Sequence, residues 1–315
     1  MEKLRIVFMG TPEFAVGILD TIYQNDYEII GVITAPDKPA GRGQKVSKSA
    51  VKDYAVSKKL LLLQPINLKS EEFLSKLKSL NANLFVVVAF RMLPEVVWKL
   101  PKLGTINMHA SLLPEYRGAA PINWVIINGE TETGVTTFFI DDKIDTGAMI
   151  LSKKTEIGAN ESAGELHDRL MQLGGEIVIE TLHQIEEGTV RTTLQVENHE
   201  AKKAHKLNKD NCKIDWSQSG NRIFNLIRGL TPYPAAWTYI IDGENKWNVK
   251  IFSASFEEKK HSDAIGRVNS TKKEIFIATK DGYLKITCLQ FPGKKRMKTH
   301  ELLNGISFTE KAIAM

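Results

Sequence analysis

The sequence predicts an α/β protein: a Rossmann-like, doubly wound and mostly parallel sheet in the N-terminal domain, with a C-terminal OB-like β-barrel domain. Two observations lead to this prediction. Short apolar runs alternate with helical patterns through the first half of the chain, as they do in sheets with crossover helices. From about Val190 the chain changes to short strand-like runs divided by Gly, Asn and Asp turns, which is typical of a small barrel. We therefore expect a catalytic-type domain over 1–189, a basic linker over 190–209 and a barrel domain over 210–315.

The first half of the chain supplies the strands and helices of the expected sheet. Its first strand, Arg5–Met9, ends at a Gly-Thr-Pro turn, where Thr11 is the expected N-cap and Pro12 the first residue of a helix reaching about Gln24. Further apolar runs predict strands over Tyr27–Thr34, Leu60–Leu63, Leu84–Ala89, Gly104–His109, Thr133–Asp141 and Ala148–Ile157. Helical patterns cover Ser70–Leu80, Pro121–Asn128 and Glu161–Glu187.

The second half supplies the barrel. A helical pattern over Ser219–Leu230 precedes the strand-like runs. Those runs are Ala236–Ile241, Lys250–Ala254, Glu274–Ala278 and Tyr283–Leu289.

Composition excludes several classes of protein. Hydrophobic residues make up 43% and charged residues 25% of the chain, which is ordinary for a globular domain. We expect no membrane partner, because no apolar run approaches the roughly 20 residues that span a bilayer. Lys3–Met9 already has the pattern of a strand, so we expect no presequence. We therefore expect a cytoplasmic location.

Cys212 and Cys288 lack the spacing of a disulfide framework or zinc site, and we expect no metal. The first turn has Gly10 but lacks the other glycines of a dinucleotide fingerprint, which disfavours a nicotinamide cofactor.

Positive charge is concentrated in one segment. The net charge is +5, and the segment from Pro36 to Lys59 holds seven basic residues against two acidic ones, so the rest of the chain is neutral. Such a concentration favours an anionic partner, with a solvated charge run as the alternative. The segment includes Lys38, Arg42, Lys45 and Lys48. Glycines on both sides of Arg42 allow its backbone to approach a partner closely, and arginine can fork onto a phosphate or a guanine edge.

One strand end carries the strongest chemical signal. The run Gly104–His109 alternates, so Asn107 and His109 point to the same face of the strand. In α/β sheets ligands bind at the carboxyl ends of strands. An amide donor and a titratable base that converge there suit oxyanion stabilisation and proton transfer. Asp145, in an Asp-Thr-Gly sequence further along, is a third candidate, although such a sequence is also good turn chemistry.

These motifs resemble those of the folate-dependent formyltransferases. Gly104–Gly118 is similar to the family signature, and Asp145-Thr146-Gly147 is similar to its downstream partner. Within the family, the chain most resembles members that act on methionine attached to initiator tRNA. Four segments in the same order carry that closer resemblance: Phe8–Ala15, Pro36–Gly43, Ile214–Trp216 with Pro232–Ala236, and Leu289–Met297. The segment Phe90–Pro94 departs from the family, whose members commonly carry Tyr-Gly there.

The resemblance implies a reaction and the residues for it. The expected reaction moves a formyl group from 10-formyltetrahydrofolate to the methionine α-amine of initiator methionyl-tRNA, with release of tetrahydrofolate. The implied catalytic set is Asn107, His109 and Asp145. The implied folate-binding residues are Ser111, Leu112, Leu113, Pro114, Phe90 and Arg91. The expected tRNA-binding residues are Arg42, Lys38, Lys45, Lys48, Lys206, Lys294, Lys295 and Arg296, and we expect a monomer.

Two alternatives remain open at this point. The first is a formyltransferase that acts on a small amine, such as glycinamide ribonucleotide or an amino sugar nucleotide. It would share the catalytic set, but it would need neither the loop that carries Arg42 nor a basic barrel. The second is a non-catalytic RNA-binding protein, since OB-like barrels bind nucleic acid readily. A binding module has no reason to keep Asn107, His109 and Asp145 together. The residues also leave open which proton each of His109 and Asp145 moves.

Overall fold

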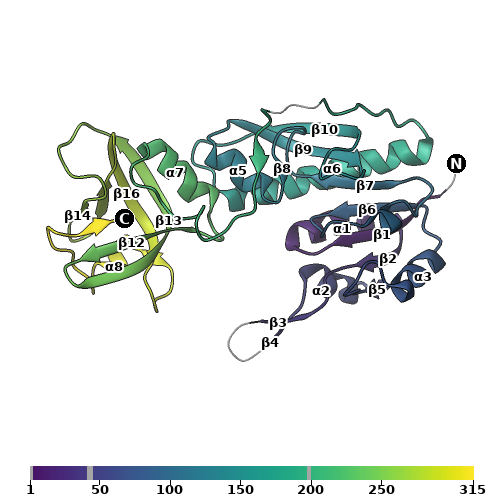
Figure 1. Cartoon of the computed structure of the whole chain (residues 1–315), viewed down its shortest axis with the longest axis horizontal. Helices are drawn as coiled ribbons and strands as arrows, with labels where there is room; N and C mark the ends of the chain where they lie inside the picture. The colour runs from purple at the N-terminus through teal and green to yellow at the C-terminus, as the bar shows by residue number, and fades with distance from the viewer. Residues whose placement is uncertain (1–2, 41–44, 197–199) are drawn as a thin grey trace. The chain divides into compact units, whose positions relative to one another are not determined.

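The computed structural model describes residues 3–40, 45–196 and 200–315 of the chain. These form two compact units (Figure 1). The first comprises Met1–Gly118, Thr133–Thr155 and His167–Lys203, and the second comprises Ala119–Glu132, Glu156–Leu166 and Ala204–Met315. None of the helices in the described part of the chain combines the length and the apolar character that crossing a bilayer demands.

The first unit is built on a seven-stranded, mostly parallel sheet with the strand order β10-β9-β7-β6-β1-β2-β5. Its strands are β1 Arg5–Gly10, β2 Glu28–Ile33, β5 Leu62–Leu63, β6 Leu84–Val88, β7 Thr105–His109, β9 Glu132–Phe139 and β10 Met149–Glu156. The neighbouring pairs from β5 to β7 are parallel, and β9 runs antiparallel to β7. The predicted Rossmann-like fold class is therefore confirmed, with the antiparallel part at one side of the sheet.

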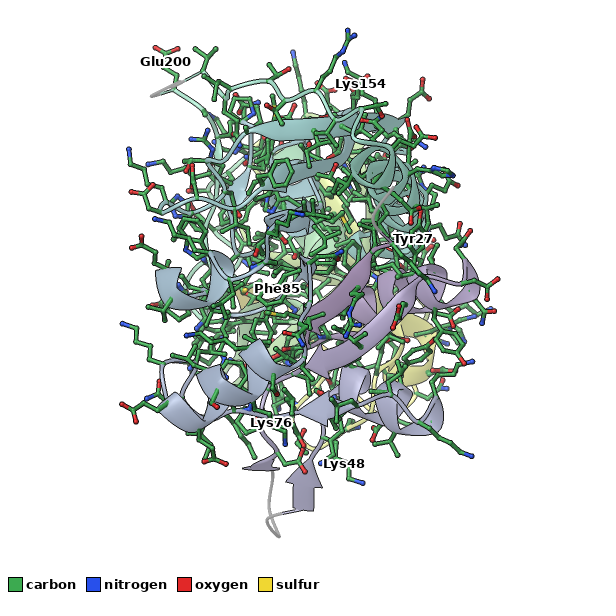
Figure 2. All side chains as sticks on the ribbon, turned by 90° about the vertical axis from the view of Figure 1, so that its right-hand side faces the viewer. Tyr27, Lys48, Lys76, Phe85, Lys154 and Glu200 are labelled. Carbon is green, nitrogen blue, oxygen red and sulfur yellow. The ribbon has the colours of Figure 1, made fainter. Side chains whose placement is uncertain are left out.

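Helices cover both faces of this sheet. On one face, α1 (Glu13–Gln24) packs closely on α6 (Ala163–Glu187), because Gly17 lies against Met171. The β7 residue Met108 reaches Gly174 of α6, so it points to this face. On the opposite face, α3 (Glu71–Ser79) and α4 (Glu95–Trp98) bury apolar side chains against β1 and β6. Phe85 of β6 lies inside this second layer (Figure 2).

Two local features differ from the sequence-based prediction. The N-cap of α1 is Pro12, not Thr11, and the helix begins at Glu13. The basic segment predicted as a loop contains a short hairpin, β3 (Lys38–Ala40) with β4 (Lys45–Ser47), and a helix, α2 (Ala50–Ser57). Ser49 caps α2, because its hydroxyl accepts a hydrogen bond from the Lys52 N–H. A serine at this position is a recognisable N-cap, but the segment was interpreted from its net charge.

The glycine at the first turn is explained by packing. A Cβ on Gly10 would lie 2.6 Å from the Cβ of Ala15 and 3.0 Å from the carbonyl oxygen of Val88. The end of β1 therefore needs a residue without a side chain, whether or not a nucleotide binds there.

The second unit contains a barrel-like antiparallel sheet with the order β14-β15-β16-β13-β12-β18, and β17 pairs with β16. Its strands are β12 Ala236–Asp242, β13 Asn245–Glu258, β14 Val268–Ser270, β15 Ile275–Ala278, β16 Gly282–Gln290, β17 Met297–Lys298 and β18 Ile313–Ala314. A bridge between Arg267 and Ile313 links the two ends of the order, which nearly closes the barrel. Helices α5 (Pro121–Ile127), α7 (Gly220–Gly229) and α8 (Thr299–Leu302) complete this unit, and the short strands β8 (Arg117–Gly118) and β11 (Lys203–Ala204) form a separate pair.

Candidate active site

Asn107 and His109 lie on β7, and Asp145 lies in the turn between β9 and β10. Figure 1 labels these strands. The register pairs Asn107 with Val87 of β6 and with Phe138 of β9, and it pairs His109 with Thr136. Val87 belongs to the apolar layer shared with α3 and α4. Paired residues of neighbouring strands lie on the same face, so Asn107 and His109 face this layer, while Met108 between them points to α6. The predicted placement of Asn107 and His109 on one face of the strand is therefore present.

His109 is buried, and its environment determines which ring nitrogen carries a proton. Nε2 lies 2.9 Å from the carbonyl oxygen of Tyr116. A carbonyl oxygen only accepts hydrogen bonds, so Nε2 is the donor. Nδ1 is then the nitrogen left for chemistry, and it faces the Asp145 carboxylate with 3.8 Å between Nδ1 and Oδ2. That separation is longer than a hydrogen bond, but it is within the range of an ion pair when the imidazole is protonated.

Asp145 is held in an unusual backbone conformation. Its φ of +55° lies in the left-handed region, which is uncommon for a residue with a side chain. The carboxylate Oδ2 accepts a hydrogen bond of 3.0 Å from the N–H of Gly118, at the end of the signature loop. Gly147 permits this turn, because a Cβ there would lie 1.6 Å from the carbonyl oxygen of Phe139. The Asp-Thr-Gly sequence is thus a turn, and the turn brings its aspartate to His109.

The loop after β7 is fixed by its own hydrogen bonds. Ser111 is buried, and its Oγ donates to the carbonyl oxygen of Glu115 at 2.6 Å. The hydroxyl of Thr136 donates to the carbonyl oxygen of Ser111 and accepts from the N–H of Leu113, at 2.7 and 3.2 Å. Leu112 and Pro114 are half-buried, so among Ser111–Pro114 these two leave side-chain surface for a ligand.

The segment after β6 places Phe90 and Arg91 differently. Arg91 donates to the carbonyl oxygen of Ile66 at 3.0 Å and also to that of Pro65, so its guanidinium binds the loop after β5. Burial lowers the pKa of Arg91 from its ordinary value. Phe90 is half-buried and packs against the apolar layer of the α3 and α4 face, together with Ile140. Phe90 is therefore the better placed of the two predicted folate contacts.

The hairpin β3–β4 carries the basic residues predicted to bind tRNA. Lys38 and Lys48 are exposed, and Figure 2 shows Lys48 at the base of the hairpin. Lys45 lies in β4, whereas Arg42 and the side chain of Lys45 lie outside the described residues.

Asp37, just before the hairpin, ties it to the body of the unit. One Asp37 carboxylate oxygen lies 2.5 Å from Nζ of Lys52, and the other accepts from Nε2 of Gln64 at 2.9 Å. Both hydrogen bonds hold the pKa of the Asp37 carboxyl below its ordinary value.

The barrel unit carries the remaining candidate tRNA contacts. Lys206, Lys294, Lys295 and Arg296 are all exposed. The guanidinium of Arg296 lies over the Phe252 ring at 4.5 Å, and its Nε is 3.1 Å from the Cys288 sulfur.

A second basic surface on the barrel was not predicted. Lys213 lies 5.8 Å from the ring of Trp237, and Lys246 lies 4.4 Å from the ring of Tyr239. Trp237 and Tyr239 alternate with buried residues of β12, so both rings stand on the outer face of the barrel. The alternation of β12 could have placed the two rings on the outer face. It could not have placed the lysines beside them, because these come from separate parts of the chain.

The chain is a member of the formyl transferase family. The sequence matches the formyl transferase family over residues 4–182 and the C-terminal domain of formyl transferases over residues 206–307. More particularly, the chain belongs to the methionyl-tRNA formyltransferase family. It is 64% identical to the methionyl-tRNA formyltransferase of Flavobacterium johnsoniae, 62% to that of Flavobacterium psychrophilum and 51% to that of Bacteroides fragilis strain ATCC 25285. The first two alignments cover 99% of both chains, and the third covers 98% of this chain and 97% of its relative.

Solved structures share the fold at lower identity. HypX from Aquifex aeolicus in complex with tetrahydrofolic acid superposes with a TM-score of 0.66 at 18% identity, over 96% of this chain and 47% of HypX. The sugar 3N-formyl transferase WlaRD, solved with dTDP and 5-N-formyl-THF, gives a TM-score of 0.65 at 22% identity over 94% of this chain and all of WlaRD. Among the described residues, no group of three or more His, Cys, Asp and Glu side chains is arranged to hold a metal ion.

Proposed function

We propose that this chain transfers a formyl group from 10-formyltetrahydrofolate to the α-amine of methionine on initiator methionyl-tRNA. The observation that carries the proposal is the geometry at β7: Asn107 and His109 share one face of the strand, and 3.8 Å separates the His109 imidazole from the Asp145 carboxylate. The family membership of the chain supports the acceptor. Formyl transfer releases tetrahydrofolate and needs no metal.

Asn107 stabilises negative charge in this mechanism. When the amine attacks the formyl carbon, the carbonyl oxygen gains negative charge. An amide donor fixed on a strand can hydrogen-bond that oxygen without reorganising. Loss of a single such donor elsewhere costs about 2.7–4 kcal/mol of transition-state stabilisation. Asn107 suits this role because its strand neighbours on both sides, Val87 and Phe138, are buried and hold β7 in place.

His109 and Asp145 move protons. Nδ1 is the ring nitrogen that the fold leaves for the reaction, because Nε2 is bonded to Tyr116. A proton on Nδ1 can pass to the leaving nitrogen of the folate, which must depart as a neutral amine. The attacking amine has to lose a proton at the same time, and the Asp145 carboxylate, on the Nδ1 side of the ring, is the base nearest to His109 for that proton.

The residues beside the catalytic set fit a reduced folate. A folate has a flat fused ring with apolar faces and polar edges. Phe90 and Ile140 present half-buried apolar surface on the layer that contains Val87, the β6 neighbour of Asn107. Leu112 and Pro114 present more after β7. We propose that these residues hold the ring of the formyl donor, with Ser111 and Leu113 fixing the shape of the loop. Arg91 supports a different loop, the one after β5, through the carbonyl oxygens of Pro65 and Ile66.

We propose that the acceptor tRNA binds two basic regions. The hairpin with Lys38, Lys45, Lys48 and Arg42 is suited to the acceptor end, and the barrel residues Lys206, Lys294, Lys295 and Arg296 are suited to phosphates further along. In this proposal the catalytic domain over 1–189 also carries the tRNA-binding hairpin, a basic linker covers 190–209, and the barrel domain over 210–315 carries the tRNA contacts at Lys294, Lys295 and Arg296. A single chain then suffices for the reaction, so we propose a monomer that works in the cytosol, where charged tRNA is made and used.

The first experiment compares acceptors. Purified chain is given 10-formyltetrahydrofolate with methionine-charged initiator tRNA, or with a small amine such as glycinamide ribonucleotide. We expect rapid formylation of the tRNA and none of the small amine. The Arg42→Ala variant should lose most of the tRNA reaction, whereas Arg191→Ala, which removes an exposed arginine elsewhere on the same unit, should keep it. Formylation of only the small amine would overturn the acceptor assignment, and no formyl transfer at all would overturn the activity.

A further inference from the structure

Gln195 lies in none of the sequence motifs, yet the fold delivers it to the active site. The segment that follows α6 runs along the edge of β10, because Met149 and Thr193 exchange two backbone hydrogen bonds of 2.8 Å. This pairing fixes the backbone two residues before Gln195. The side chain of Gln195 is half-buried, and it reaches the turn that contains Asp145.

The Gln195 amide joins two loops of the site. Its Nε2 donates to the carbonyl oxygens of Asp145 and Gly147, at 3.0 and 2.8 Å. Its Oε1 accepts from Nε and Nη2 of Arg117, at 3.1 and 2.6 Å. An amide group has two N–H donors and two acceptor lone pairs, so these bonds use its whole capacity. Arg117 immediately precedes Gly118, whose N–H donates to the Asp145 carboxylate.

We propose that Gln195 is a positioning residue for catalysis, which locks the Asp145 turn onto the Arg117–Gly118 backbone. The lock resists rotation of Asp145 out of its left-handed conformation, a conformation that costs free energy unless the surroundings hold it. It thereby keeps the carboxylate beside Nδ1 of His109. This inference rests on the proposed function, because it assigns Gln195 a part in the same reaction.

Replacement of the amide by an acid gives the sharpest test. In Gln195→Glu the side chain keeps its size and can still accept from Arg117, but it loses both donors and sets an anion against the carbonyl oxygens of Asp145 and Gly147. We expect a fall in kcat of up to about 100-fold, the size reported when reacting groups are misplaced by about 1 Å. KM values for tRNA and for the formyl donor should stay within about threefold, because the proposal gives the Gln195 amide bonds only to Arg117 and to the Asp145 turn. Thr193→Ala is the matched control, since Thr193 contributes only backbone bonds to the same segment.

A second readout does not depend on the reaction. The amide resonance of Gly118 in an NMR spectrum reports on the hydrogen bond from Gly118 to Asp145. We expect this resonance to move in Gln195→Glu and to stay in place in Thr193→Ala, with Asp145→Asn as the reference for altered bonding. If wild-type chain fails to formylate methionyl-tRNA, the proposed function falls, while the resonance still tests the lock. Wild-type kcat in Gln195→Glu, a loss confined to KM, or an unmoved Gly118 resonance would each overturn the positioning role.

Discussion

His109 offers only one ring nitrogen to the reaction. Tyr116 adopts a left-handed backbone conformation with φ of +59°, and its carbonyl oxygen occupies Nε2 of His109 at 2.9 Å. The imidazole is therefore oriented by the main chain of the signature loop, and the opposite nitrogen points to Asp145. A backbone acceptor cannot be removed by substitution, which makes the orientation of the ring a property of the loop rather than of a particular neighbour.

We predict that His109→Ala and Asp145→Asn each lower kcat at least about 100-fold, the lower end for general acid–base catalysis. Asp145→Asn keeps an oxygen that can accept from Gly118, so the turn should persist while the charge is lost. Single-turnover formylation of methionyl-tRNA measures the chemical step, and thermal unfolding checks that the fold is intact. Asp142→Asn is the control, because it removes an exposed carboxylate from the same turn. Near wild-type rates in either variant would refute its catalytic role.

At the scale of elements, the hairpin β3–β4 depends on Asp37 at its base. The carboxylate bonds Lys52 of α2 and Gln64 after β5, so it joins the hairpin to two neighbouring elements. These bonds lower the pKa of Asp37, and a carboxyl with a lowered folded-state pKa contributes stability above its unfolded pKa of about 3.9. That contribution is lost as the pH falls through the folded value. The hairpin base is therefore intact throughout the neutral range.

We predict that Asp37→Asn raises KM for tRNA about three- to tenfold and leaves kcat at saturating tRNA nearly unchanged. The amide can still bond Gln64, but it cannot pair its charge with Lys52, so the hairpin that carries the tRNA-binding residues is held less firmly. A factor of this size corresponds to about 0.7–1.4 kcal/mol of binding free energy. Initial rates over a range of tRNA concentrations measure it. Asp53→Asn, an exposed carboxylate on α2, should behave as wild type. If both substitutions changed KM for tRNA equally, the change would come from the net charge of the protein and not from the contacts of Asp37 at the base of the hairpin.

The proposed tRNA contact at Arg296, between β16 and β17, can be tested by comparing how fast the two cysteines are alkylated. Cys212 is buried in the barrel core and burial raises the pKa of its thiol, so alkylation at pH 8 should be slow. Cys288 is half-buried beside Arg296 and should react first. Because Arg296 is a proposed tRNA contact, we predict that initiator tRNA slows alkylation of Cys288 at least about threefold, with peptide mass spectrometry as the measurement. An unchanged rate at saturating tRNA would place the tRNA away from this turn.

Local patterns predicted the elements that build the catalytic site and missed those that support it. Alternation in β7 was enough to place Asn107 and His109 on one face, because strand period and parallel pairing determine the face. The contribution of Gln195 could not be derived, since its partners Arg117 and Asp145 are 78 and 50 residues away. The pairing of Lys52 with Asp37 could not be derived from the charge count of the segment either, because it depends on how the chain folds back around the hairpin. Contacts between distant loops, unlike periodicity, leave no mark in a single sequence.

At the scale of the whole molecule, positive charge is divided between the hairpin and the barrel. The segment Pro36–Lys59, which includes the hairpin, explains the net charge of +5. The barrel unit nevertheless also exposes Lys206, Lys294, Lys295 and Arg296. A small acceptor would contact only residues near the catalytic set. A tRNA presents phosphates along its whole length, and each phosphate contact releases counterions. The dependence of the reaction rate on salt concentration therefore measures how many phosphate contacts the two basic regions make.

We predict that kcat/KM for methionyl-tRNA falls steeply with salt, and that replacing Lys294, Lys295 and Arg296 together by alanine makes the fall shallower. Each lost phosphate contact reduces the slope of log affinity against log salt by about 1, so three contacts would remove about 3. The triple variant Lys69→Ala, Lys76→Ala and Lys78→Ala is the matched control, because it removes the same charge from exposed positions around α3. The slope of this control should equal that of wild type, because the slope depends on the number of counterions released at phosphate contacts. Lysines that only attract tRNA from a distance change the rate at a given salt concentration more than they change this number. Equal slopes in all three proteins would show that the turn between β16 and β17 does not contact phosphate, and would leave the hairpin as the tRNA-binding region.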